Sequence, residues 1–277
     1  MDQTGSRTAL ATAYMRAAHQ LLDDPPLLFS DPVALPLLGE RAGEIIRGRL
    51  DRFQSPGGKA LRSHVCLRSR FAEDRLAQAV ARGAKAYVLV GAGFDSFAFR
   101  QPDWARRIHI FEVDHPATQA EKRERIASSN LCVPDNMTFV ANDFSERSLG
   151  EALARTGLSR EEAVFFSWLG VCMYLKQAAI VETLSAMATF AIGSEVVLTF
   201  KQPDGAENSG KLADTVAAVG EAFVSFFTPD EMDALLRRCG FSDIAFLTPQ
   251  DAQAAYFTPP RHDLPAPART NIVSAAK

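Results

Sequence analysis

The chain has 277 residues, of which 47% are hydrophobic and 23% charged, and its formal net charge at pH 7 is −3. This composition is that of an ordinary globular protein, and the length suits one large α/β domain. Proteins that bind nucleic acid usually carry a basic stripe, and no cluster of lysine and arginine stands out here, so nucleic acid is not an expected partner.

The cysteines and the apolar runs exclude several further classes of protein. Cys66, Cys132, Cys172 and Cys239 lie too far apart to form a metal or redox motif. His64 and Cys66 are two positions apart, but no second pair with ligand spacing accompanies them, so no metal site is predicted. No stretch reaches the roughly 18 apolar residues of a membrane helix, and the first seven residues lack the pattern of a signal peptide. We therefore expect a cytoplasmic protein with free thiols and no membrane partner.

The N-terminal part of the chain reads as helical. Residues 8–22 have the alanine- and leucine-rich periodicity of an amphipathic helix. Asp31 is the expected N-cap of a second helix, with Pro32 at its first position. The run Ser55-Pro56-Gly57-Gly58 indicates a loop, and residues 60–82 then predict a long helix that ends before a glycine.

From residue 86 onward, short continuous apolar runs alternate with helical patterns. Such runs are typical of strands that are buried on both faces of a parallel sheet. The alternation predicts an α/β fold with a doubly wound, mostly parallel, Rossmann-like sheet. The expected strands are 86–90, 108–113, 137–141, 163–167, 195–200, 241–247 and 269–274. The expected helices are 116–129, 145–156, 176–191 and 229–239.

Two glycines, Gly91 and Gly93, directly follow the first expected strand. In doubly wound folds this turn is where nucleotides bind, and a side chain there would keep the ligand away from the backbone. Enzymes that use a dinucleotide usually have a third glycine three positions later, where this chain has Ser96. The pattern therefore favours a cofactor with one ribose and no phosphate, such as S-adenosylmethionine, over a nicotinamide dinucleotide.

Acidic residues follow the second and third expected strands. Asp114 lies 21 positions beyond Gly93, where a carboxylate can accept both hydroxyl hydrogens of a ribose. Asp143 could accept a hydrogen bond from an adenine amino group while Phe144 packs on the ring. A solvated strand end or a plain turn would explain each residue taken alone.

The ordered set of motifs resembles the class I S-adenosylmethionine-dependent methyltransferases and, more closely, the leucine carboxyl methyltransferase-like family. The match runs in register along nearly the whole chain. It is carried by Thr8-Ala9, Arg16-Ala17, Asp31-Pro32, Arg68-Ser69-Arg70, Val90 to Asp95, Phe111 to Asp114, Asp143-Phe144, Ser167 to Leu175 and Leu235 to Phe241.

The resemblance implies which parts of the cofactor the matching residues bind. The methionine part would lie against Gly91 and Gly93, the ribose against Asp114, and the adenine against Asp143 and Phe144. An arginine before the first strand would hold the cofactor's carboxylate, because a guanidinium can bind a carboxylate through two parallel hydrogen bonds. Arg68 and Arg70 both fall near that place, and we favour Arg68.

The resemblance also implies an organisation for the whole chain. We predict a single methyltransferase domain over residues 1–277, with an N-terminal helical cap at 1–60 and a cofactor-binding core at 61–200. Residues 201–277 would supply an acceptor-side lid and the last strands. The aromatic residues available to line an acceptor pocket are Phe223, Phe226 and Phe227.

The resemblance implies methyl transfer to a small acceptor. A carboxylate acceptor needs no base, whereas a hydroxyl acceptor benefits from one, and the candidates are His115 and Tyr174. We predict O-methylation of a small carboxylic acid or hydroxyl compound. One alternative is an NAD-dependent oxidoreductase on the same fold. The other is a non-catalytic S-adenosylmethionine-binding protein, because Leu169 stands where many relatives have a glutamate before glycine.

Overall fold

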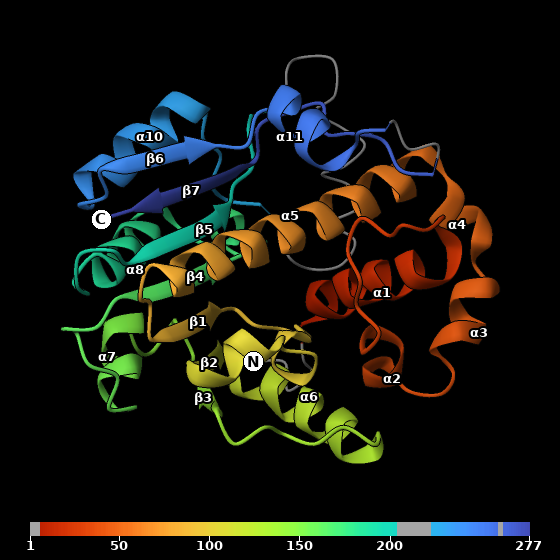
Figure 1. Ribbon diagram of the computed structural model, residues 1–277, viewed down its shortest axis with the longest axis horizontal. Helices are drawn as coiled ribbons and strands as arrows, with labels where there is room; N and C mark the ends of the chain where they lie inside the picture. The colour runs from red at the N-terminus through yellow and green to blue at the C-terminus, as the bar shows by residue number, and fades with distance from the viewer. Residues whose placement is uncertain (1–5, 204–222, 260–262) are drawn as a thin grey trace.

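The computed structural model describes residues 6–203, 223–259 and 263–277. Its strands are β1 Ala86–Val90, β2 His109–Asp114, β3 Met137–Ala141, β4 Val164–Trp168, β5 Glu195–Thr199, β6 Asp243–Phe246 and β7 Ile272–Ala276. They form one seven-stranded sheet in the order β3-β2-β1-β4-β5-β7-β6 (Figure 1). Only β7 pairs antiparallel with its neighbours. The predicted α/β fold with a doubly wound, mostly parallel sheet is confirmed.

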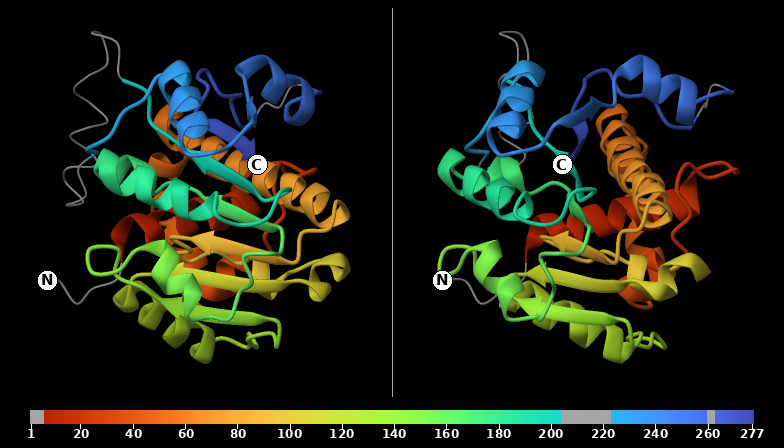
Figure 2. Two further views of the ribbon diagram at one scale, coloured as in Figure 1. Left: turned by 90° about the vertical axis from the view of Figure 1, so that its left-hand side faces the viewer. Right: turned by 60° about the vertical axis from the view of Figure 1, so that its left-hand side comes forward.

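Helices cover both faces of this sheet, as Figures 1 and 2 show. They are α5 Pro56–Ala81, α6 Pro116–Ser128, α7 Leu149–Ala154, α8 Gln177–Met187, α10 Pro229–Arg238 and α11 Pro249–Tyr256. Every residue of β1 is buried. Val88 and Val90 join the core under α7, α8 and α10, and Tyr87 and Leu89 join the core under α5 and α11. Burial on both faces is why the sequence of this strand is continuously apolar.

The first part of the chain forms a helical layer at one end of the sheet. It contains α1 Arg7–Leu22, α2 Ala34–Leu38, α3 Ala42–Arg47 and α4 Leu50–Gln54. These helices share a third apolar core, into which Phe94 and Ile126 also project. Helix α1 packs along α5 (Figure 1), so this layer is attached to the sheet through the long helix.

The structure corrects two predictions for this layer. Asp31 is not an N-cap, because α2 begins only at Ala34 and is preceded by Val33. The loop predicted at 55–58 is the start of α5, with Ser55 as its N-cap and Pro56 at its first position. Gly58 is needed inside this first turn, because a Cβ there would collide with the carbonyl oxygen of Arg52.

Helix α11 was not predicted, and part of the expected lid cannot be placed. Residues 204–222, which belong to the region 201–277 expected to supply the acceptor-side lid and the last strands, lie outside the described residues. Among the described ranges, no helix is long and apolar enough to cross a membrane.

Candidate functional site

The carboxyl ends of β1, β2 and β4 meet where the strand order reverses direction. The chain proceeds from β1 outward to β3 and then returns to place β4 on the other side of β1. Open α/β sheets bind their ligands in the crevice at this point. A cavity of about 210 Å³ lies there, walled by the loops after these strands and by α1 and α5.

The turn after β1 forms the floor of this cavity. Gly91 and Gly93 both have positive φ, at 70° and 53°, which side chains rarely tolerate. A Cβ on Gly91 would collide with Val171, and one on Gly93 would lie 3.0 Å from the Cβ of Ala9 in α1. Both glycines therefore satisfy a backbone requirement and make room for Val171 and Ala9, and the turn that contains them lines the cavity.

Asp114, at the end of β2, is anchored to this turn. Its carboxylate accepts hydrogen bonds from the backbone N–H groups of Gly93 and, at 2.6 Å, of His115. Burial raises the pKa of Asp114, and these two donors oppose that effect. Each carboxylate oxygen can accept more than one hydrogen bond, so the group can still receive hydroxyl donors from the cavity.

The structure separates the two candidate arginines. Arg70 is on the surface, where its Nε donates to both carboxylate oxygens of Asp74 at 3.0 and 2.9 Å. Arg68 lines the cavity. Its guanidinium packs against Gly170, where a Cβ would lie 2.5 Å from Nη1, and it has neither a hydrogen bond nor an ion pair with any described residue.

The environment of Arg68 leaves it charged. Burial and the nearby Arg16 lower its pKa to about 10, which is still well above neutral pH. Asp95 favours the charged form of Arg68 without pairing with it. A charged, largely desolvated group that makes no ion pair with a described residue is costly, and an anionic ligand would offset that cost. Arg68 is therefore the group of this cavity best placed to bind a carboxylate.

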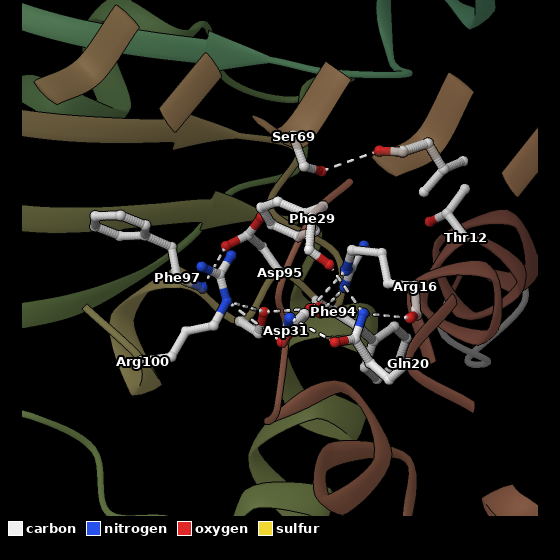
Figure 3. A network of polar contacts seen from close by, with 12 residues as sticks. Thr12, Arg16, Gln20, Phe29, Asp31, Ser69, Phe94, Asp95, Phe97 and Arg100 are labelled. Atoms are coloured by element: carbon white, nitrogen blue, oxygen red, sulfur yellow. Dashed lines mark hydrogen bonds and ion pairs between the residues drawn. The ribbon is translucent and has the colours of Figure 1, made fainter. Parts of the chain in front are cut away.

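A buried polar network fixes α1 over the glycine turn, and Figure 3 shows its members. Arg16 of α1 donates to Asp31 at 3.1 Å and to the backbone carbonyl of Phe94 at 2.5 Å. Asp31 also accepts from the Ser96 hydroxyl at 2.7 Å and lies 3.3 Å from the guanidinium of Arg100. The network therefore joins α1, the loop before α2 and the glycine turn after β1.

Sequence reasoning did not predict this network, although Arg16 and Asp31 were among the residues that carried the resemblance. The local signal at Asp31, an aspartate before a proline, indicates a helix cap. Its true partners are 15 and 65 residues away along the chain, and no local pattern reveals such pairings.

At the other end of the cavity, only two of the three residues His115, Asp143 and Phe144 are part of the wall. His115 and Phe144 line the cavity, whereas Asp143 does not. Asp143 Oδ1 accepts from the backbone N–H and the hydroxyl of Ser145, at 2.8 and 2.7 Å, which lowers the Asp143 pKa. His115 Nδ1 accepts from the N–H of Ala117 and so caps α6.

Tyr174 and Leu169 line the cavity on the β4 side, next to Gly170. The ring of Tyr174 lies 5.2 Å from that of Phe223, at an angle of 32°. Phe227 is buried in the core under α8 and α10, and Phe226 is 43% exposed. Of the three phenylalanines expected at an acceptor pocket, Phe223 is thus the one in contact with a residue of the cavity wall.

The described residues contain no group of three histidine, cysteine, aspartate or glutamate side chains that could hold a metal ion. The site combines bare backbone after β1, a carboxylate after β2 and an uncompensated cation on α5. These groups fit a nucleoside cofactor that carries an amino-acid carboxylate. Together with the strand order, they define a Rossmann-like enzyme of the S-adenosylmethionine-dependent type.

Comparison with known proteins identifies the family. The model of the leucine carboxyl methyltransferase family matches residues 9–188. YktD of Bacillus subtilis (strain 168), named as an S-adenosyl-L-methionine-dependent methyltransferase, is 30% identical over 302 residues, covering 98% of each chain. A Saccharopolyspora erythraea protein with the same type of name is 28% identical over 245 residues, covering 83% of this chain and 81% of its own. The chain belongs to the leucine carboxyl methyltransferase family.

Solved structures show the same fold at low sequence identity. A DUF574 family protein from Streptomyces avermitilis has a TM-score of 0.60 at 13% identity and covers 99% of this chain and 98% of its own. A Thermobifida fusca protein described as a methyltransferase has a TM-score of 0.57 at 16% identity, with 87% and 92% covered. The protein is thus an S-adenosylmethionine-dependent methyltransferase, and the oxidoreductase and non-catalytic alternatives are set aside.

Proposed function

We propose that the cavity holds S-adenosylmethionine with its carboxylate on Arg68, its methionine part over Gly91 and Gly93, its ribose on Asp114 and its adenine beside Phe144. The observation that carries this proposal is the uncompensated guanidinium of Arg68. It faces the same cavity as the Asp114 carboxylate, with the glycine turn between them. A nucleoside that carries an amino-acid carboxylate offers an anion to Arg68 and hydroxyl donors to Asp114.

We propose O-methylation of a small carboxylic acid or hydroxyl compound as the reaction. The cofactor, when bound, supplies the activated methyl group, and the protein supplies position and a dry site. Helix α1 contributes to the dry site, because Ala9 packs directly on Gly93 and Arg16 holds the carbonyl of Phe94. The small cavity and the absence of a basic stripe in the sequence support a small acceptor over a nucleic acid.

The choice of oxygen as the acceptor atom rests on the family and on Tyr174. The family is described as methylating a carboxyl group, which needs no base. Tyr174 lies in the wall beside Gly170, where it can orient an acceptor carboxyl or hydroxyl group. His115 is less suited to act as a base, because Nδ1 caps α6 and Nε2 faces Asp143 at 3.5 Å.

We also propose that the enzyme works in the cytoplasm. Cys66, Cys172 and Cys239 are buried free thiols, and Cys132 is an exposed free thiol. Free cysteines of this kind are typical of a reducing compartment.

Two measurements test the proposed function. Isothermal titration with S-adenosylhomocysteine should give a Kd below about 100 µM, and absence of heat at that concentration would contradict the cofactor site. Release of S-adenosylhomocysteine is then measured with a panel of small carboxylic acids, phenols and amines. Turnover with acids or phenols supports O-methylation, and turnover with amines alone would contradict it.

A further inference from the structure

Asp143 is poorly placed to read the adenine. One of its carboxylate oxygens, Oδ1, is occupied by two hydrogen bonds from Ser145. The other, Oδ2, faces Nε2 of His115 at 3.5 Å. Asp143 is absent from the cavity wall, whereas both of its neighbours in space, His115 and Phe144, are part of it.

Both ring nitrogens of His115 face protein groups, so the ring can meet a ligand in the cavity only through its faces or its carbon edge. A backbone N–H can only donate, so Nδ1 is the acceptor of the bond from Ala117 at 3.2 Å and the proton of the neutral ring resides on Nε2. Nε2 lies 3.5 Å from Asp143 Oδ2, so its N–H is directed at that carboxylate across a long contact. The side chain is 45% exposed, at the mouth of the cavity.

The position of His115 places its ring beside the expected sugar. It follows Asp114 directly, and its own backbone N–H donates to the Asp114 carboxylate at 2.6 Å. The end of β3 is tied to the same point, since the N–H of Asn142 donates to the carbonyl of Asp114 at 2.8 Å. His115 therefore sits between the carboxylate proposed for the ribose and the loop that carries Phe144.

We propose that His115 is the residue that contacts the nucleoside at the junction of base and sugar, and that Asp143 is a positioning residue that orients the His115 ring. The face of the ring packs against the nucleoside, while Nε2–H points to Asp143 and Nδ1 stays on α6. This inference rests on the cofactor placement proposed above. It changes the role assigned to Asp143 from direct contact to support.

A double-mutant cycle measured by titration with S-adenosylhomocysteine tests this assignment. His115→Asn removes the ring and Nε2 but keeps an oxygen that can cap α6, so the helix keeps its N-cap. We expect this variant to weaken binding up to about tenfold, as loss of an aromatic ring contact would, with no change in Tm. Asp143→Asn should weaken binding only about two- to threefold, because it loosens the His115 ring without removing it.

The double variant separates support from direct contact. If Asp143 acts through His115, the variant with both substitutions binds no more weakly than His115→Asn alone. Equal affinity of His115→Asn and wild type, or independent effects that multiply in the double variant, would overturn the assignment while leaving the cofactor site intact. Failure of the wild type to bind S-adenosylhomocysteine would overturn the cofactor site itself.

Discussion

The charged side chains at the two ends of the cavity differ in their exposure to solvent. At the end proposed for the methionine part of the cofactor, Arg16 and Asp31 are almost completely buried, with side-chain exposures of 7% and 0%, and Arg68 is largely desolvated. At the end proposed for the nucleoside, His115 and Asp143 have side-chain exposures of 45% and 16%. Charge–charge interactions are several times stronger in a buried environment than in water. Most of the binding energy should therefore come from the methionine end.

The first test of this comparison removes the buried cation. Arg68→Ala should weaken S-adenosylhomocysteine binding about 100-fold, because a charge-assisted pair with the ligand carboxylate is lost from a desolvated site. The stability of the ligand-free protein should not fall, since Arg68 has no described partner to lose. Titration and thermal unfolding measure the two effects.

Arg70→Ala is the matched control, because Arg70 is on the same helix but pairs with Asp74 at the surface. Its binding should stay within about twofold of wild type. If Arg68→Ala binds as well as Arg70→Ala, the methionine end is not where the carboxylate lies.

The next largest effect is expected at Asp114. Asp114→Ala removes the acceptor proposed for the ribose and the acceptor of the Gly93 N–H. We expect binding to weaken about 10- to 30-fold, as for loss of hydrogen bonds to a charged group. Adenosine alone should lose a similar factor. An unchanged affinity in titration would contradict the ribose assignment.

A third test concerns the floor of the cavity. Gly91→Ala and Gly157→Ala place a side chain at similar φ values, 70° and 78°, but only the residue at 91 meets another atom, on Val171. Gly157→Ala should lose about 1–2 kcal/mol of stability from the backbone strain, and Gly91→Ala should lose more, because its Cβ would also collide with Val171. Gly91→Ala should also weaken cofactor binding about tenfold, and Gly157→Ala should not. Equal binding by the two variants would show that the floor does not contact the ligand.

The parts of this site that the sequence predicted are those with local signals. A buried strand followed by glycines, and an acidic residue at the end of the next strand, are patterns that short stretches contain, and Gly91, Gly93 and Asp114 were found through them. Arg68 was chosen over Arg70 through the family resemblance, and the structure places it in the wall. The carboxyl ends of neighbouring parallel strands bring these residues together.

The parts that the sequence could not predict depend on contacts between distant segments. The Asp31 carboxylate binds groups from α1 and from the loop after β1, and these partners override its local cap signal. Asp143 shows a local pairing that its motif did not indicate, because Ser145 donates two hydrogen bonds to its Oδ1. Which hydrogen-bond partner each carboxylate takes depends on all the groups that surround it in the fold, and a short sequence motif does not show those groups.

The smallest expected effect is the dependence of binding on pH. Burial raises the pKa of Asp114 above its usual 3.8, so the group takes up a proton at a higher pH than an exposed aspartate does. Protonation removes the charged acceptor, so binding is complete at neutral pH and falls as the pH drops toward the raised pKa. We expect the affinity of the wild type to fall as the pH is lowered from 7, and that of Asp114→Asn to show no such fall. The same slope in both proteins would assign the effect to another group.

A crystal structure with S-adenosylhomocysteine tests the central claim most directly. The account predicts the amino-acid carboxylate on the guanidinium of Arg68, the chain of the ligand over Gly91 and Gly93, and both ribose hydroxyls on Asp114. A ligand bound with its carboxylate away from Arg68, or with the ribose making no contact with Asp114, would contradict it.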